Sequence, residues 1–283
     1  MNSELWLLPG ASLAISSAPG IERVLARARP LAGIGRGLDA ILHAHASLAQ
    51  IPWAALLRNT IADAAGHDWL IADLVSIHAE PTTARIVAHA GASLPASVCA
   101  DLGKALEPWF VDENFSMHES GAGRWLLCCP AGTMPPATPA IDAALGLDLR
   151  AIMPKSRDWQ RRSNEMQILL TQQTLNQARV TQGLPSANSL WFWGYGRLPA
   201  KLSLGWVAIA SSDPLLAALA VAAGVPLLDP FDQRPGPVMR DLRDPLLLAE
   251  VWKRGLRPAR AQLRFADGSG CETGAWDRFK FWR

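Results

Sequence analysis

The fold class is set by residues 189–229, which read SLWFWGYGRLPAKLSLGWVAIASSDPLLAALAVAAGVPLLD. Apolar runs and a helical stretch predict, in order, a strand at 189–193, a strand at 207–210, a helix at 214–223 and a short buried strand at 225–229. Gly224 follows the helix where a left-handed residue commonly ends one. A strand–helix–strand order is typical of an α/β fold, so we expect a mainly parallel sheet covered by helices.

The rest of the chain supplies further elements of both kinds. Alternating or apolar runs predict strands at 69–78, 84–90 and 123–129. Helical spacing predicts helices at 51–65, 96–109, 158–179 and 246–254. The residues from 261 to 282 read as a C-terminal β-hairpin, with Asp267 and Gly268 at its turn.

A proline-rich stretch at residues 130–139 is the best candidate for a domain boundary. It predicts three parts: an N-terminal α/β part at 1–129, a linker at 130–157 and a C-terminal α/β part at 158–283. The two α/β parts alternatively pack as one domain.

Composition narrows the class of protein. The chain has 283 residues, 49% of them hydrophobic and 18% charged, which favours a folded protein over a disordered one. A net charge of +2 gives no electrostatic footprint for nucleic acid. The four Cys have no metal-ligand spacing and imply no disulfide framework. The N-terminus lacks a signal peptide and the most apolar window, 215–228, is too short to span a bilayer, so we expect a cytoplasmic protein. We expect no cofactor.

Polar residues and glycines surround the strand at 189–193, where a core strand does not need them. Arginine offers a planar fork for phosphate or carboxylate, and glycines let backbone N–H groups approach an anion. The predicted ligand contacts are Asn176, Arg179, Asn188, Gly194, Gly196 and Arg197, with a turn at 194–196. Structural roles are equally open: Asn176 as a cap, Asn188 as a brace of the turn, and Arg197 as a surface ion-pair partner.

Trp191 and Trp193 lie two residues apart and therefore face the same side of a strand. They predict core packing or a protein interface, since no basic groove accompanies them as a base-stacking platform would require. The 12 Trp of the chain make an aromatic interface plausible.

Two glycine-rich stretches invite a phosphate-loop interpretation. Residues 33–37 read Gly-Ile-Gly-Arg-Gly, but they lack the P-loop pattern and favour a flexible connection. Residues 267–270 read Asp-Gly-Ser-Gly, which between two candidate strands favours a hairpin turn.

The segment 176–199 resembles a motif of the archaeal-type cofactor-independent phosphoglycerate mutases, metal-dependent enzymes of the alkaline phosphatase superfamily. The matching positions are Asn176, Arg179, Gly183, Pro185, Ala187, Asn188, the apolar run 190–193 and Gly194 to Gly196. The resemblance continues through 205–229. A closer resemblance, over most of the chain, is to a group of proteobacterial phosphoglycerate mutase-like or RpfE-type regulatory proteins with the Asn-Ser-Leu-Trp-Phe-Trp-Gly signature.

The chain departs from the mutases where their chemistry resides. The family implies two metal ions held by Asp and His, and a Ser nucleophile. Here no His follows residue 118, no Asp-Gly motif stands near residues 5–12, and Ala217-Ala218 replaces the usual Lys-Gly. Without metal ions little would activate a hydroxyl or neutralise a transferring phosphoryl group.

We therefore expect a non-catalytic, phosphomutase-derived protein that acts through a small anionic or phosphorylated ligand or a protein partner, away from nucleic acid and membranes. Two alternatives stay open. One is an active metal-dependent phosphoglycerate mutase or phosphatase with an atypical site. The other is a protein-interaction scaffold that uses a Trp-rich face.

Overall fold

The computed structural model describes residues 3–45, 50–121, 123–234, 236–258 and 260–274. The chain forms two compact units: unit 1 contains residues 1–49 and 199–283, and unit 2 contains residues 50–198. This division differs from the predicted one. The proline-rich residues 130–157 are not a linker between domains, since they lie inside unit 2 and include two short helices, α6 (Ile141–Ala144) and α7 (Leu149–Ile152).

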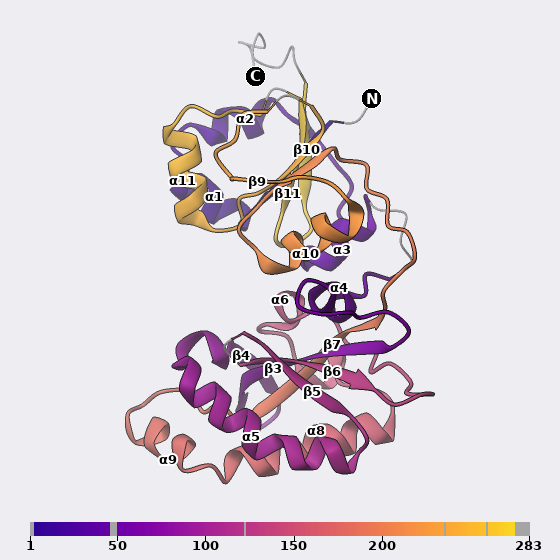
Figure 1. Cartoon of the computed structure of the whole chain (residues 1–283). Helices are drawn as coiled ribbons and strands as arrows, with labels where there is room; N and C mark the ends of the chain where they lie inside the picture. The colour runs from indigo at the N-terminus through magenta and orange to yellow at the C-terminus, as the bar shows by residue number, and fades with distance from the viewer. Residues whose placement is uncertain (1–2, 46–49, 122, 235, 259, 275–283) are drawn as a thin grey trace. The chain divides into compact units, whose positions relative to one another are not determined.

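Unit 1 is assembled from both ends of the chain (Figure 1). Its N-terminal half contains β1 (Glu4–Leu8), α1 (Ala11–Ser17), α2 (Ile21–Arg27), β2 (Arg29–Pro30) and α3 (Gly37–His43). Its C-terminal half contains β8 (Ala208–Ala210), α10 (Pro214–Ala223), β9 (Leu227–Leu228), β10 (Val238–Asp241), α11 (Pro245–Lys253), β11 (Ala261–Phe265) and β12 (Gly270–Thr273).

The sheet of unit 1 is mainly parallel, as the sequence predicts. Its strand order is β2-β12-β11-β1-β10-β8-β9, and β11, β1, β10, β8 and β9 are joined by parallel ladders. The C-terminal hairpin predicted at 261–282 is confirmed up to Thr273 as β11 and β12, which pair antiparallel; residues 275–282 lie outside the described residues. The helix α10 has its predicted bounds, and Gly224 ends it with a left-handed φ of 65°.

Apolar helix faces cover the sheet of unit 1. Trp6 and Leu8 of β1 pack in one core cluster with Leu248 and Val251 of α11, together with residues of α1 and α2. Each of these four side chains is at most 1% exposed. Burial of a large apolar side chain contributes about 1.5–3 kcal/mol, so this layer holds the two halves of the unit together.

Unit 2 is continuous in sequence. Its elements are α4 (Trp53–Asn59), β3 (Asp68–Ala79), β4 (Ala84–His89), the 3-10 turn η1 (Ala90–Ser93), α5 (Ala96–Asp112), β5 (Ser116–Gly121), β6 (Arg124–Cys129), α6, α7, α8 (Arg157–Thr171), α9 (Thr174–Thr181) and β7 (Ser189–Arg197). The long helix predicted at 158–179 is interrupted between α8 and α9 at Gln172 and Gln173.

The sheet of unit 2 is antiparallel, which corrects the expectation that residues 189–229 form one parallel strand–helix–strand unit. The long strand β3 pairs antiparallel with β4, β6 and β7, and β6 pairs with β5. The strand β7 therefore belongs to a different sheet from β8 and β9. Period-two alternation alone does not reveal which sheet a strand joins.

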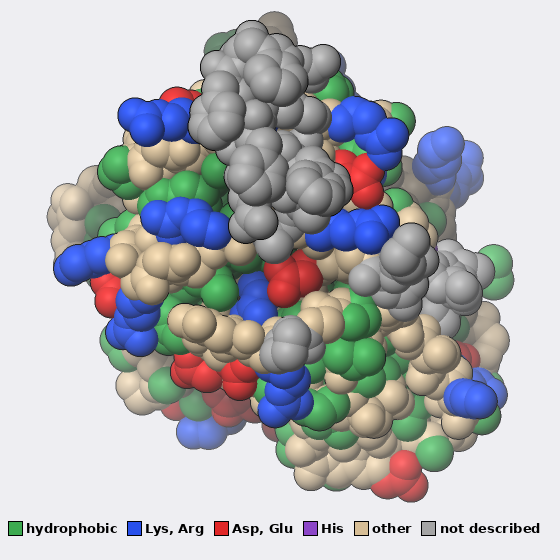
Figure 2. Space-filling model, turned by 90° about the horizontal axis from the view of Figure 1, so that it is seen from above, with side chains coloured by type: hydrophobic (Ala, Val, Ile, Leu, Met, Phe, Trp, Pro, Cys, Tyr) green, Lys and Arg blue, Asp and Glu red, His purple; other side chains and the backbone are tan. Residues whose placement is uncertain are grey.

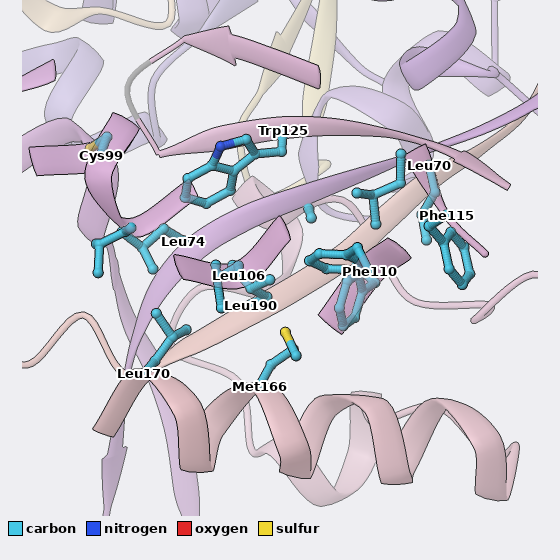
Figure 3. Close-up of a cluster of buried hydrophobic side chains, with 14 of the residues drawn as sticks. Leu70, Leu74, Cys99, Leu106, Phe110, Phe115, Trp125, Met166, Leu170 and Leu190 are labelled. Carbon is cyan, nitrogen blue, oxygen red and sulfur yellow. The ribbon is translucent and has the colours of Figure 1, made fainter. Parts of the chain in front are cut away.

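One face of this sheet forms the main core of unit 2 (Figure 3). Leu70 and Leu74 of β3, Phe110 of α5, and Met166 and Leu170 of α8 are each at most 1% exposed. Phe110 also meets neighbouring rings edge-on, with a centroid distance of 6.2 Å to Phe115. The opposite face of β3 and β7 contacts α4, as Figure 1 also shows.

Aromatic side chains fasten the proline-rich segment to the body of unit 2. Trp159 Nε1 donates to the carbonyl of Met134 at 2.7 Å, and Tyr195 Oη donates to the carbonyl of Thr133 at 3.0 Å. Trp191 Nε1 donates to the carbonyl of Pro139 at 2.9 Å. These bonds give carbonyls of the segment a buried or half-buried partner, so the segment is an integral part of the unit.

Candidate functional site

Asn176 and Arg179 on α9 are held by contacts inside unit 2. Asn176 is 4% exposed; its Nδ2 donates to the carbonyls of Leu170 at 2.7 Å and Ala187 at 2.9 Å, and its Oδ1 accepts from the backbone N–H of Ala187 at 2.7 Å. Arg179 Nε donates to the carbonyl of Pro185 at 2.8 Å. Together they fix the loop that leads into β7.

Asn188 and Arg197 join the two ends of β7 to β3. Asn188 makes two bonds with the backbone of Ile77, accepting from its N–H at 2.8 Å and donating to its carbonyl at 2.9 Å. Arg197 makes a bidentate ion pair with Asp68, with distances of 3.1 Å from Nε and 3.0 Å from Nη2. Asn188 thus braces the chain beside β7, and Arg197 has an ion-pair partner, as the structural alternatives proposed. A ligand role for any of the six predicted residues stays a prediction.

The turn predicted at 194–196 is wrong, because β7 continues to Arg197. The ladder with β3 shifts register at this point, and Gly194 has a φ of 65°, so the glycines form a β-bulge. A Cβ on Gly196 would lie 2.6 Å from the Cβ of Pro52. Close packing of the chain accounts for these glycines.

Trp191 and Trp193 lie inside unit 2. They are 3% and 2% exposed, and Trp193 Nε1 donates to Asp73 Oδ2 at 2.8 Å. Neither side chain forms an accessible surface in this structure, because the core and the proline-rich segment enclose them. The core-packing alternative describes their surroundings, and an interface role for them stays untested.

Beside Trp193 lies a buried charge cluster around Asp73, which is 0% exposed. Arg124 donates to both carboxylate oxygens, at 2.6 Å from Nε and 2.8 Å from Nη2, and His89 Nε2 lies 3.4 Å from Oδ1. Burial raises the pKa of Asp73, but the charge and hydrogen bonds of Arg124 and the neighbouring His89 lower it overall. The sequence signal for this cluster was a carboxylate within an apolar strand.

A second polar cluster stands at the carboxyl edge of the parallel sheet in unit 1. The parallel register of β8 and β10 pairs Ala210 with Arg240, which brings the next residues, Ser211 and Asp241, side by side. Ser211 Oγ donates to Asp241 Oδ2 at 3.0 Å. Ligands of open α/β sheets bind at this edge, so the cluster is the candidate functional site.

Arg243 pairs with both carboxylates of this site. Its Nε donates to Asp241 Oδ1 at 2.7 Å, and its Nη2 donates to Asp241 Oδ2 at 2.9 Å and to Asp213 Oδ2 at 2.6 Å. Asp213 also caps α10, since its Oδ1 accepts from the N–H of Leu215 at 2.8 Å. Every carboxylate oxygen of the two Asp residues therefore has a donor.

The two carboxylates shift the pKa of Arg243. Burial lowers the pKa of Arg243, but the hydrogen bonds and charges of Asp241 and then Asp213 raise it overall. The neighbouring strand β1 ends in Leu8, followed by Pro9 and Gly10, so its end contributes no ionisable side chain. The arrangement is an ion-pair cluster with one arginine between two carboxylates.

Replacing Arg243 by Met is expected to destabilise unit 1 by about 2–3 kcal/mol, since two partly buried carboxylates lose a charged donor. Urea unfolding followed by tryptophan fluorescence measures the change. Arg254→Met is the matched control, because Arg254 is 55% exposed and its pair with Glu250 lies on the helix surface; we expect a change below about 0.5 kcal/mol. Equal effects of the two substitutions would contradict a structural role for the cluster.

Among the described residues, no group of three or more His, Cys, Asp or Glu side chains is placed to hold a metal ion. No helix in the described part of the chain is both long and apolar enough to cross a membrane. On the described part of the face in Figure 2, Lys and Arg side chains are spaced apart, with Asp and Glu among them.

Two solved structures are similar to this chain over nearly its whole length. One is the cofactor-independent phosphoglycerate mutase from Thermoplasma acidophilum DSM 1728, with 15% identity, a TM-score of 0.36, and coverage of 97% of this chain and 90% of that one. The other is the PH0037 protein from Pyrococcus horikoshii, with 11% identity, a TM-score of 0.42, and coverage of 96% and 87%. No family model matches the chain, and no curated protein matches it.

Proposed function

We propose that this protein is a non-catalytic binding protein on a phosphomutase-like scaffold, which recognises a small anionic or phosphorylated ligand and acts in regulation, as the RpfE-type group implies. The observation that supports it is the closed ion-pair cluster of Asp213, Asp241 and Arg243. This cluster occupies the edge of the sheet at which an α/β enzyme of this kind would place its reacting groups.

The carboxylates of the site are already paired, which is the chemical reason to expect no catalysis. Metal-dependent phosphoryl transfer requires carboxylates that coordinate ions, and the ions neutralise the charge of the transferring group. In this chain Asp241 is committed to Arg243 and Ser211. The guanidinium group already balances the negative charge, so a metal ion would have to displace it from a bidentate pair.

A ligand panel tests the proposal. Thermal unfolding of the full chain is measured with 3-phosphoglycerate, inorganic phosphate and nucleotides, each with and without Mg²⁺, Mn²⁺ or Zn²⁺. We expect a phospho-compound to raise the unfolding temperature without metal; at 100 times its dissociation constant a ligand stabilises by about 2.7 kcal/mol. Parallel assays of mutase and phosphatase activity are expected to show no turnover.

Metal-dependent turnover that is lost in Asp241→Asn, and kept in the exposed control Asp101→Asn, would overturn the proposal in favour of an active enzyme. Stabilisation by none of the small molecules would also overturn it, and would direct the search to protein partners.

A further inference from the structure

The strand β7 forms an edge of the sheet of unit 2, yet most of it is buried. The same part of β3, residues 68–73, pairs with both β6 and β7, which therefore lie on its two sides. In the described part of the chain β7 pairs with no strand except β3, and its residues 189–193 are all buried. An edge strand presents unpaired N–H and C=O groups to which another chain can pair, so a different part of the protein must cover this edge.

The proline-rich segment, residues 130–139, is that cover. Three side-chain hydrogen bonds join it to β7: from Thr138 Oγ1 to the carbonyl of Phe192, from Trp191 Nε1 to the carbonyl of Pro139 at 2.9 Å, and from Tyr195 Oη to the carbonyl of Thr133 at 3.0 Å. Among the described residues no backbone–backbone hydrogen bond joins the segment to β7. Four of its residues are prolines, which have no N–H. The segment thus covers the edge without offering a strand that a further chain could join.

Two features of the proline-rich segment make the covered state less stable. Ala137 has a left-handed φ of 52°, which costs free energy in any residue with a Cβ. Met134 is 74% exposed, so this large apolar side chain contributes little burial. Segments with few buried apolar contacts and few backbone hydrogen bonds open at a lower free energy than the whole domain. We therefore expect the segment to detach while the sheet stays folded.

The other two outer strands of this sheet, β4 and β5, have polar and charged residues instead of a cover of this kind. Arg85 and His89 belong to β4, and His118 and Glu119 belong to β5. In β7, residues 189–196 include no Asp, Glu, Lys, Arg or His. Charged side chains on an edge strand hinder pairing with another strand, and like charges directly opposite each other are destabilising. Nothing in the side-chain charges of residues 189–196 therefore opposes pairing with an identical strand.

We propose that the proline-rich segment is a removable cover, which keeps β7 from pairing antiparallel with β7 of a second copy of this chain. Two identical strands related by a two-fold axis present the same residues to each other, so a second copy always offers a matching edge. Pairing is confined to residues 189–193, because the β-bulge at Gly194 interrupts the strand beyond them. This inference goes beyond the proposed function, since it concerns unit 2 and the candidate functional site lies in unit 1.

The test loosens the cover and measures association of the full chain. The double variant Thr138→Val with Tyr195→Phe removes two of the three hydrogen bonds and keeps side chains of nearly the same shape. Thr181→Val is the matched control, because its hydroxyl donates to the carbonyl of Gln177 on an exposed helix face. Analytical ultracentrifugation should show a dimerisation constant about tenfold higher for the double variant than for the wild type or the control. Hydrogen exchange at residues 189–193 of the double variant should be faster than in the wild type in dilute solution, and slower again where the dimer forms.

A double variant that stays monomeric, whether or not its exchange is faster, would overturn the proposal. A dimer that leaves exchange at residues 189–193 unprotected would overturn it too, because association would then use another surface. If the double variant does not fold, the wild type in urea below its unfolding midpoint decides. There residues 189–193 should exchange before β3 does, and a higher protein concentration should slow them; exchange of both strands together would overturn the removable cover.

Discussion

Replacing Asp73 by Ala is expected to destabilise unit 2 by about 3–5 kcal/mol, since it removes the fully buried carboxylate from its ion pair with Arg124. Arg124 loses two hydrogen bonds and Trp193 loses the acceptor of its indole N–H. Equilibrium urea unfolding, followed by tryptophan fluorescence, measures the loss. The matched control is Asp68→Ala on the same strand, because its pair with Arg197 is exposed; there we expect a loss of about 0–1 kcal/mol.

The loss of stability in acid gives a second measure of how much Asp73 stabilises the folded protein. Its pKa in the folded protein lies below the ordinary value of 3.8. Its stabilising contribution is therefore present above that value and is lost as the pH falls through the folded pKa. The wild type should lose stability below about pH 4 more steeply than Asp73→Ala. Parallel curves for the two proteins would show that Asp73 contributes no pH-dependent stability.

Replacing Asn176 by Ala is expected to destabilise unit 2 by about 3 kcal/mol, at about 1 kcal/mol for each of three hydrogen bonds. The carbonyl of Leu170 and both backbone groups of Ala187 would lose their side-chain partner. Chemical unfolding checks the value, with Gln177→Ala as the control, since Gln177 is exposed on the same helix. Unchanged stability of Asn176→Ala would contradict a structural role for this side chain.

The predicted elements that rely on local signals are confirmed by the structure. The helix α10 has the predicted bounds, and Gly224 ends it as expected; the structure adds that Asp213 is its N-cap and that Pro214 lies in its first turn. The hairpin of β11 and β12 follows from two apolar runs around an Asp-Gly turn. Helix caps and tight turns are formed by residues that are neighbours in the chain, so they can be predicted from one sequence.

The candidate site was not predictable in the same way. Asp213, Asp241 and Arg243 come from the ends of two strands, and only the parallel register of β8 and β10 brings them together. Likewise Arg264 lies next to a loop more than 200 residues earlier in the chain. The sequence drew attention to Asn176 and Arg179, but it could not show that backbone carbonyls occupy their donors.

The sequence by itself determined the α/β class, the turn of the terminal hairpin and the bounds of α10, since hydrophobic periodicity and turn and capping residues act over a few positions. Only the tertiary structure decided that unit 2 interrupts unit 1, that β7 joins an antiparallel sheet, and which charges are paired. The physical reason is that strand pairing and ion pairing join residues far apart in the chain. A local pattern shows that a strand is apolar. The elements against which that strand packs determine which partners its polar side chains find.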